Sequence, residues 1–219
     1  MKTRAAGVWL VLMAAAASAA AQEIDRIVAA IDMQAITQSD VEREYKLEGF
    51  MNQGRIPAGG PAPDVFQQTL NRLIDQRLLN AEEPAEGGQR QLINTHARQQ
   101  MEELQKRVAD PKKFQASLKA LRISQDELLR RFEEQERVLH LIDDRLRPEA
   151  RVNGAAVQEY YEKVFLPEYT KGNKSVAAPP LQDVQERIQE ILTQQRIDQL
   201  LTAWLAELRK AHHVKVINP

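Results

Sequence analysis

The sequence contains no cysteine among its 219 residues. Disulfide bonds, thiol catalysis and cysteine-based metal sites are therefore excluded. The fold must be held together by side-chain packing.

Glycine and aromatic residues are also scarce, because the chain has nine glycines and only 5% Phe, Trp and Tyr. Glutamine, glutamate, arginine and leucine are frequent instead. This composition is typical of a helical protein with modest hydrophobic cores.

Neither sign of charge dominates, since 30 Lys and Arg residues stand against 31 Asp and Glu residues. A near-neutral surface argues against nucleic acid as a partner. The chain also lacks an H-E-x-x-H motif, a G-x-S-x-G motif and a phosphate-binding loop. These are the common signatures of zinc, serine and nucleotide chemistry. We therefore expect no catalytic residue, no cofactor and no metal.

An apolar run long enough to cross a membrane is absent, and the nearest candidate lies at the start of the chain. Lys2 and Arg4 precede the apolar stretch Ala5–Ala17, and an A-x-A cleavage site ends at Ala21. This pattern predicts a signal peptide over 1–21 and a periplasmic location. The alternative is an uncleaved anchor, although a membrane span needs about 20 apolar residues. Cleavage would leave 198 residues with 28 basic and 31 acidic side chains, a net charge of −3.

The longest segment without Gly or Pro after this region is Leu181–Ala211. Its apolar residues recur at the spacing of one helix face. They are Val184, Ile188, Ile191, Leu192, Leu200, Leu201, Trp204, Leu205 and Leu208. The pattern predicts one helix on the order of 45 Å long, along which the rest of the chain packs.

Two short segments favour β-strands. His213–Ile217 alternates polar and apolar residues, and Ile24–Ile36 is rich in β-branched residues with a turn at Asp32-Met33-Gln34. Both patterns are typical of half-buried strands. Since a strand needs a neighbour, we expect the two ends of the mature chain to meet in one small sheet.

Helix starts are predicted between these strands wherever a capping residue precedes an apolar period. Gln53–Pro63 and Leu166–Pro180 are rich in turn-forming or irregular sequence and predict loops. The predicted starts lie at Thr37 or Ser39 with Asp40 or Glu42 as the acid, Asp64, Asp110-Pro111, Ser124 with Glu127, and Asn153.

The four histidines offer little chemistry in the sequence. His96 falls on the polar side of its helix, and His140 has no partner at metal-ligand spacing. His212 and His213 could bind a metal weakly, or could simply suit the negative end of the helix dipole. Tyr160-Tyr161 allows either a ligand-binding role or packing at a junction.

In order along the chain, these segments resemble the N-terminal chaperone domain of SurA-type periplasmic folding factors, which is related in architecture to the substrate-binding part of trigger factor. The resemblance covers most of the mature chain. It is carried by 27–31 with 36–41, by 73–79, by the capped helix 124–148, by 157–161, and by the last helix with Val214–Val216.

The resemblance departs from the family in three places. Met33-Gln34 replaces an Asn-Gly-like turn, and Pro84 with Gly87-Gly88 interrupts a helix that usually continues. The family also inserts parvulin prolyl isomerase domains before the last helix, where this chain has only Phe165–Pro180. Domains begin at about 50 residues, so the resemblance implies a chaperone without the isomerase.

The predicted fold is mainly α, with residues 22–165 and 181–219 forming one discontinuous domain around a linker at 166–180. The resemblance implies an ATP-independent periplasmic chaperone for unfolded clients, outer-membrane precursors above all. The alternatives are a prolyl isomerase and a non-catalytic helical adaptor of the envelope. Candidate client-binding residues, each of which could instead be ordinary core, are Phe50, Met51, Ile56, Phe66, Met101, Phe114, Tyr160 and Tyr161.

Overall fold

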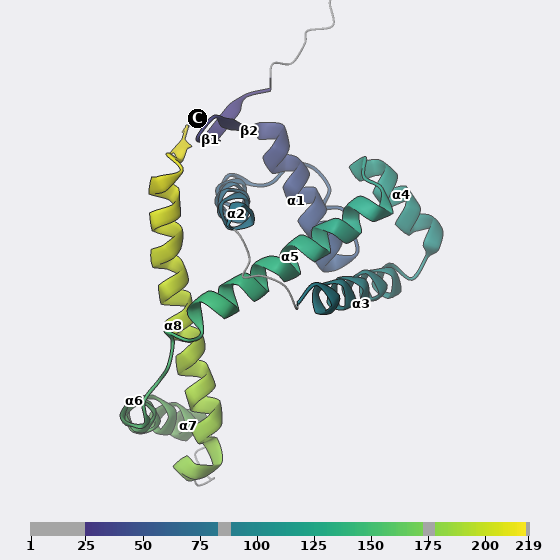
Figure 1. The fold of residues 1–219 in the computed structure, drawn as a ribbon. Coiled ribbons are helices and arrows are strands. Elements are labelled where there is room, and N and C mark those ends of the chain that lie inside the picture. Colours follow the sequence, from purple (N-terminus) through teal and green to yellow (C-terminus); the bar gives the residue numbers. More distant parts are fainter. Residues whose placement is uncertain (1–24, 83–88, 173–177, 218–219) are drawn as a thin grey trace, which may run out of the picture.

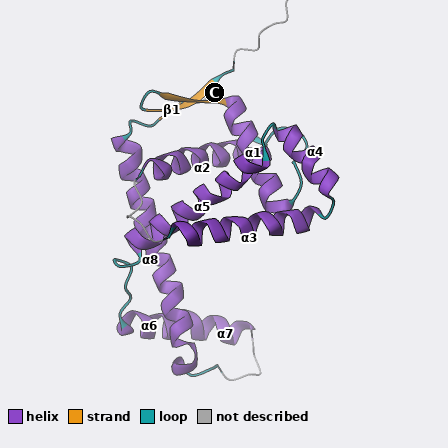
Figure 2. Cartoon of the chain, turned by 45° about the vertical axis from the view of Figure 1, so that its right-hand side comes forward, coloured by secondary structure: helices purple, strands orange, loops and turns teal. Residues whose placement is uncertain are grey.

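A computed structural model describes residues 25–82, 89–172 and 178–217, so the predicted signal peptide lies outside the described residues. The described chain is mainly helical with one small sheet, as predicted (Figures 1 and 2). Its elements are β1 (Ile27–Ile31), β2 (Gln34–Thr37), α1 (Gln38–Gln53), α2 (Pro63–Ala81), α3 (Arg90–Val108), α4 (Pro111–Leu121), α5 (Gln125–Leu146), α6 (Gly154–Tyr160), the π-helix η1 (Tyr161–Phe165), α7 (Leu166–Gly172), α8 (Leu181–Ala211) and β3 (Lys215–Val216).

The sheet joins the two ends of the described chain. Its order is β2-β1-β3, and both pairings are antiparallel. Ala29 lies opposite Val216, and the amide of Ile217 donates to the carbonyl of Val28 over 2.9 Å. The predicted meeting of the hairpin with the C-terminal strand is therefore confirmed, and Figure 1 shows the C-terminus beside β1 and β2.

Helix α8 begins and ends where the sequence predicts. Its C-terminal half packs on α2 and α5, and its N-terminal half packs on α6 (Figure 1). Arg209 pairs with Asp75 of α2 over 2.6 Å, and the guanidinium of Arg145 lies 4.4 Å from the ring centre of Trp204. The predicted face omitted Ile197, which is buried.

Two hydrophobic cores divide the helical body. The first lies under the sheet and contains side chains of α2, the C-terminal part of α5 and the C-terminal half of α8. The second lies between α3, α4 and the N-terminal part of α5. Helix α1 contributes Val41 to the first core and Phe50 to the second, while α5 contributes Leu141 and Phe132 in the same way. These two helices therefore connect the cores.

Four of the predicted helix starts, at Thr37, Asp110, Ser124 and Asn153, are confirmed by side-chain caps, whereas the helix predicted from Asp64 begins at Pro63 without a side-chain cap. Ser124 and Glu127 form a reciprocal capping box, and the side chain of Asp110 accepts from the amides of Lys112 and Lys113, which follow Pro111. The side chain of Asn153 accepts from the amide of Ala156 over 2.9 Å. Each contact satisfies amides that a helix N-terminus leaves unpaired.

The predicted loop over Leu166–Pro180 is wrong in its first part, because Leu166–Gly172 is helical and continues from α6 through η1. Pro167 cannot donate an amide hydrogen, which argues against a helix in the sequence. A π turn directly before this proline widens the helix and accommodates it. Residues 173–177 lie outside the described residues. Among the helices that the structure describes, none is both long and apolar enough to cross a membrane.

Candidate functional site

A groove lies where the two ends of the described chain meet α1 and α2. Its cavity measures about 240 Å³. The apolar side chains of Val28, Phe66, Leu70 and Ile217 line it, and Gly60, Pro61 and Pro63 border it from the loop before α2. Its polar lining consists of Arg26, Gln38, Glu42 and Gln67. An apolar hollow with a few polar groups is the usual character of a binding site.

Large apolar side chains are exposed on the sheet beside this groove. Ile217 is 50% exposed, Ile27 is 47% exposed and Val216 is 42% exposed. Because β3 is an edge strand, its outer side can also pair with another extended chain. Apolar side chains and an edge strand thus occur together at one place.

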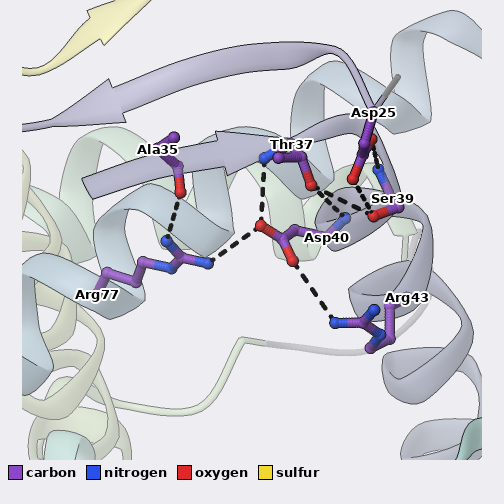
Figure 3. A network of polar contacts seen from close by, with 7 residues as sticks. All are labelled: Asp25, Ala35, Thr37, Ser39, Asp40, Arg43 and Arg77. Atoms are coloured by element: carbon purple, nitrogen blue, oxygen red, sulfur yellow. Dashed lines mark hydrogen bonds and ion pairs between the residues drawn. The ribbon is translucent and has the colours of Figure 1, made fainter. Parts of the chain in front are cut away.

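A network of polar contacts fixes the hairpin to the start of α1 (Figure 3). The hydroxyl of Thr37 accepts from the amide of Asp40 over 3.3 Å, and the Asp40 carboxylate accepts from the amide of Thr37 over 3.2 Å. Arg77 of α2 lies 3.7 Å from the same carboxylate and donates to the carbonyl of Ala35 over 3.4 Å. These contacts join β2, α1 and α2, the last two of which also contribute residues to the groove.

Asp25, two positions before β1, extends this network to the start of the described chain (Figure 3). Its carboxylate accepts from the amide of Ser39 over 3.1 Å and also from the hydroxyl of Ser39. The hydroxyl hydrogen bond is the main reason that the pKa of Asp25 lies below its ordinary value.

The structure buries four of the eight predicted client-binding residues. Phe50, Met51, Met101 and Phe114 all belong to the second core, and the rings of Phe50 and Phe114 lie 5.8 Å apart. They are not accessible to a partner in this conformation. These four side chains are therefore ordinary core residues, which was the alternative to client binding.

Two predicted residues do line hollows on the surface. Phe66 lies in the groove described above, partly buried against the first core. Ile56 lines a second hollow of about 520 Å³ beside α1, whose other lining includes Tyr45, Glu48 and Arg72. The charged lining of this second hollow suits an apolar segment less well than the groove does.

Tyr160 and Tyr161 lie on the helical arm formed by α6, η1 and α7, none of whose residues lines the groove. Figure 2 shows α6 and α7 at the opposite end of α8 from the sheet. The hydroxyl of Tyr161 donates to the carbonyl of Pro179 over 2.8 Å, and its ring stacks on Phe165 at 5.6 Å. Tyr161 thus connects the arm to the start of α8, which is packing at a junction. Tyr160 is partly buried on the same arm.

The expectation that His140 lacks a ligand partner is wrong. His140 and Glu136 lie one turn apart on α5, and His96 of α3 approaches them from the facing helix. Nδ1 of His96 lies 3.2 Å from a carboxylate oxygen of Glu136. The i, i+4 spacing of Glu136 and His140 could have indicated in the sequence that these two side chains share a helix face. That His96 of α3 joins them depends on the packing of α3 against α5.

His212 and His213 lie at the end of α8 and contact the β1–β2 turn. Their Nδ1 atoms lie 2.9 Å and 3.2 Å from the two carboxylate oxygens of Asp32. Each imidazole is thus directed at a different oxygen, and the pair joins the turn to the helix end.

Comparison of the chain with protein-family models, with curated proteins and with solved structures finds no match.

Proposed function

We propose that this chain is a periplasmic, ATP-independent chaperone that holds unfolded exported proteins, with outer-membrane precursors as its main clients. The observation that carries the proposal is the groove at the meeting of the chain ends. Val28, Phe66 and Leu70 form an apolar floor, and the half-exposed Ile217 borders it next to an edge strand. An extended apolar client segment would bury its side chains in the groove and pair its backbone with β3.

The size of the groove fits transient holding better than tight capture. A cavity of about 240 Å³ accepts one or two apolar side chains at a time. So small a contact contributes only a modest binding free energy. A client can therefore dissociate without ATP. The resemblance to SurA-type factors supports the same class of activity and the same compartment.

An aggregation assay tests the proposal. An unfolded outer-membrane β-barrel protein and an unrelated soluble protein are each diluted from denaturant, with and without the purified chain, and light scattering is followed. We expect suppression for the β-barrel protein. No suppression at several-fold molar excess would contradict the proposal.

Ile217→Asp and Leu139→Asp form a matched pair for this assay. Both side chains are exposed, at 50% and 59%, so neither change should unfold the protein. Ile217 borders the groove, whereas Leu139 lies on α5 outside it. Ile217→Asp should weaken suppression and Leu139→Asp should leave it unchanged.

The isomerase alternative is tested by a proline-limited peptide assay. The described residues between α6 and α8 are largely helical, with Tyr161–Gly172 accounted for by η1 and α7. A parvulin domain is built on a β-sheet, so we expect no acceleration of proline isomerisation. Catalysis at a rate above that of buffer would favour the alternative.

A further inference from the structure

Three metal-ligating side chains converge between α3 and α5, on elements that the proposed groove does not use. Glu136 and His140 lie four residues apart on α5, so they share one face. His96 of α3 faces them, and one donor atom from each of the three residues lies within 4.8 Å of the others. The imidazole rings of His96 and His140 are nearly parallel, with an interplanar angle of 18° and centres 6.3 Å apart.

Glu136 is unusual because its carboxylate is buried without a permanent cation. Its side chain is 9% exposed. One oxygen faces His96 over 3.2 Å, and the side-chain amide of Gln100 donates to the other. Among the described residues, His96 is the only basic group within ion-pair distance of Glu136.

The other carboxylate with similar burial shows what Glu136 lacks. Glu44 forms an ion pair with the guanidinium of Arg131, which stays charged at every accessible pH. A buried carboxylate is costly unless a positive charge compensates it. In the described part of the chain, Glu136 has no such partner: its polar neighbours are His96 and Gln100, and a metal ion bound beside it would supply the compensating charge.

We propose that His96, Glu136 and His140 bind a divalent transition metal, with Zn²⁺ the best match. Two imidazoles and one carboxylate are a frequent zinc ligand set, and nitrogen donors disfavour Mg²⁺ and Ca²⁺. Ligands about 2.0–2.1 Å from a tetrahedral ion lie about 3.3 Å from each other. The His96–Glu136 distance of 3.2 Å already meets this requirement, and the donor atom of His140, which lies within 4.8 Å of the other two, would have to move closer as the ion binds.

The remaining features of the cluster suit a metal site with an open position. The side chain of His96 is 41% exposed, so an ion can enter from solvent and keep a water as its fourth ligand. Gln100 holds the second oxygen of Glu136, as outer-shell groups do for ligating carboxylates. A bound ion would cross-link α3 to α5 and stabilise the second core.

Isothermal titration of the untagged protein with ZnCl₂ tests this site, and the four histidines supply a matched control. His96→Ala/His140→Ala removes the proposed ligands, whereas His212→Ala/His213→Ala removes the same number of imidazoles elsewhere. We expect one Zn²⁺ per wild-type chain and a rise in melting temperature on adding zinc. The first variant should lose affinity by about tenfold or more, and the second should keep both effects.

Glu136→Gln and Co²⁺ spectroscopy complete the test. Glu136→Gln preserves side-chain shape and should weaken zinc binding while circular dichroism shows an intact fold. Co²⁺ in the wild type should give the intense visible absorption of a four-coordinate ion, and the His96→Ala/His140→Ala variant should not. The proposal is overturned by no zinc binding at micromolar concentration, by unchanged affinity in that variant, or by loss of binding in His212→Ala/His213→Ala.

Discussion

The carboxylate of Asp32 accepts a hydrogen bond from Nδ1 of His212 over 2.9 Å, and the backbone amide of Asp32 donates to the carbonyl of His212 over the same distance. Asp32 lies in the β1–β2 turn with φ of 49°, a left-handed conformation that Asp and Asn tolerate. The two residues therefore join the hairpin turn to the end of α8 by backbone and side chain together.

Acid should weaken this junction. The hydrogen bond from His212, followed by that from His213, holds the pKa of Asp32 below its ordinary value of 3.8. A lowered pKa means that the stabilisation is present above the ordinary value and is lost as the pH falls through the folded-state value. Asp32→Asn should therefore flatten the fall in melting temperature below about pH 4, measured by circular dichroism. An equally steep fall in the variant would contradict this role.

Phe50→Leu should separate core packing from client binding. Phe50 is fully buried beside Phe114, so the smaller side chain should lower the free energy of unfolding by about 1–3 kcal/mol. Assayed well below its melting temperature, the variant should suppress aggregation as the wild type does. A loss of suppression without a loss of stability would restore Phe50 as a client-binding residue.

Gly49→Ala should destabilise the loop after α1. A Cβ at Gly49 would lie 2.4 Å from Cγ of Pro57, and the proline ring cannot rotate away. We expect a cost of about 1–3 kcal/mol in urea unfolding. Gly154→Ala is the control, because a Cβ there meets nothing within 4 Å and should be neutral or stabilising. Equal effects of the two changes would refute the steric explanation.

Arg131→Met should be among the most damaging single changes. Arg131 pairs with the buried Glu44 and donates to Gln76 over 2.6 Å. Burial raises the pKa of Glu44, and Arg131 opposes that effect. Loss of the guanidinium should cost about 3–5 kcal/mol, since an unpaired buried charge remains. Adding Glu44→Leu should recover most of the loss, and a double variant no more stable than the single one would contradict this account.

Most helices and strands could be predicted because capping residues and hydrophobic periods are patterns of residues close together in the sequence. Ser124 with Glu127 marked the start of α5, and the change of period after His213 marked β3. Pairing β3 with β1 followed from the need of a strand for a neighbour. Leu166–Gly172 was missed because Pro167 argues locally against a helix, and the π turn before it is visible only in the structure.

The sites were less predictable, because they depend on which helix faces which. The sequence separates His96 from Glu136 by 40 positions, and only the packing of α3 on α5 brings them together. Phe50 and Phe66 are both apolar helix residues in the sequence, yet one is core and the other lines the groove. Hydrophobic period identifies the face that is buried but not the partner that buries it.

The pairing of β1 with β3 also constrains the order of folding. Ala29 and Val216 are 187 positions apart (216 − 29), so β1 gains its second neighbour only after the chain has been made as far as Val216. Closing so long a loop carries an entropic cost, and contacts between distant positions slow folding. We therefore expect pairing of β3 with β1 to be a late step in folding. Until then, the edge of β1 that faces away from β2 has no strand partner.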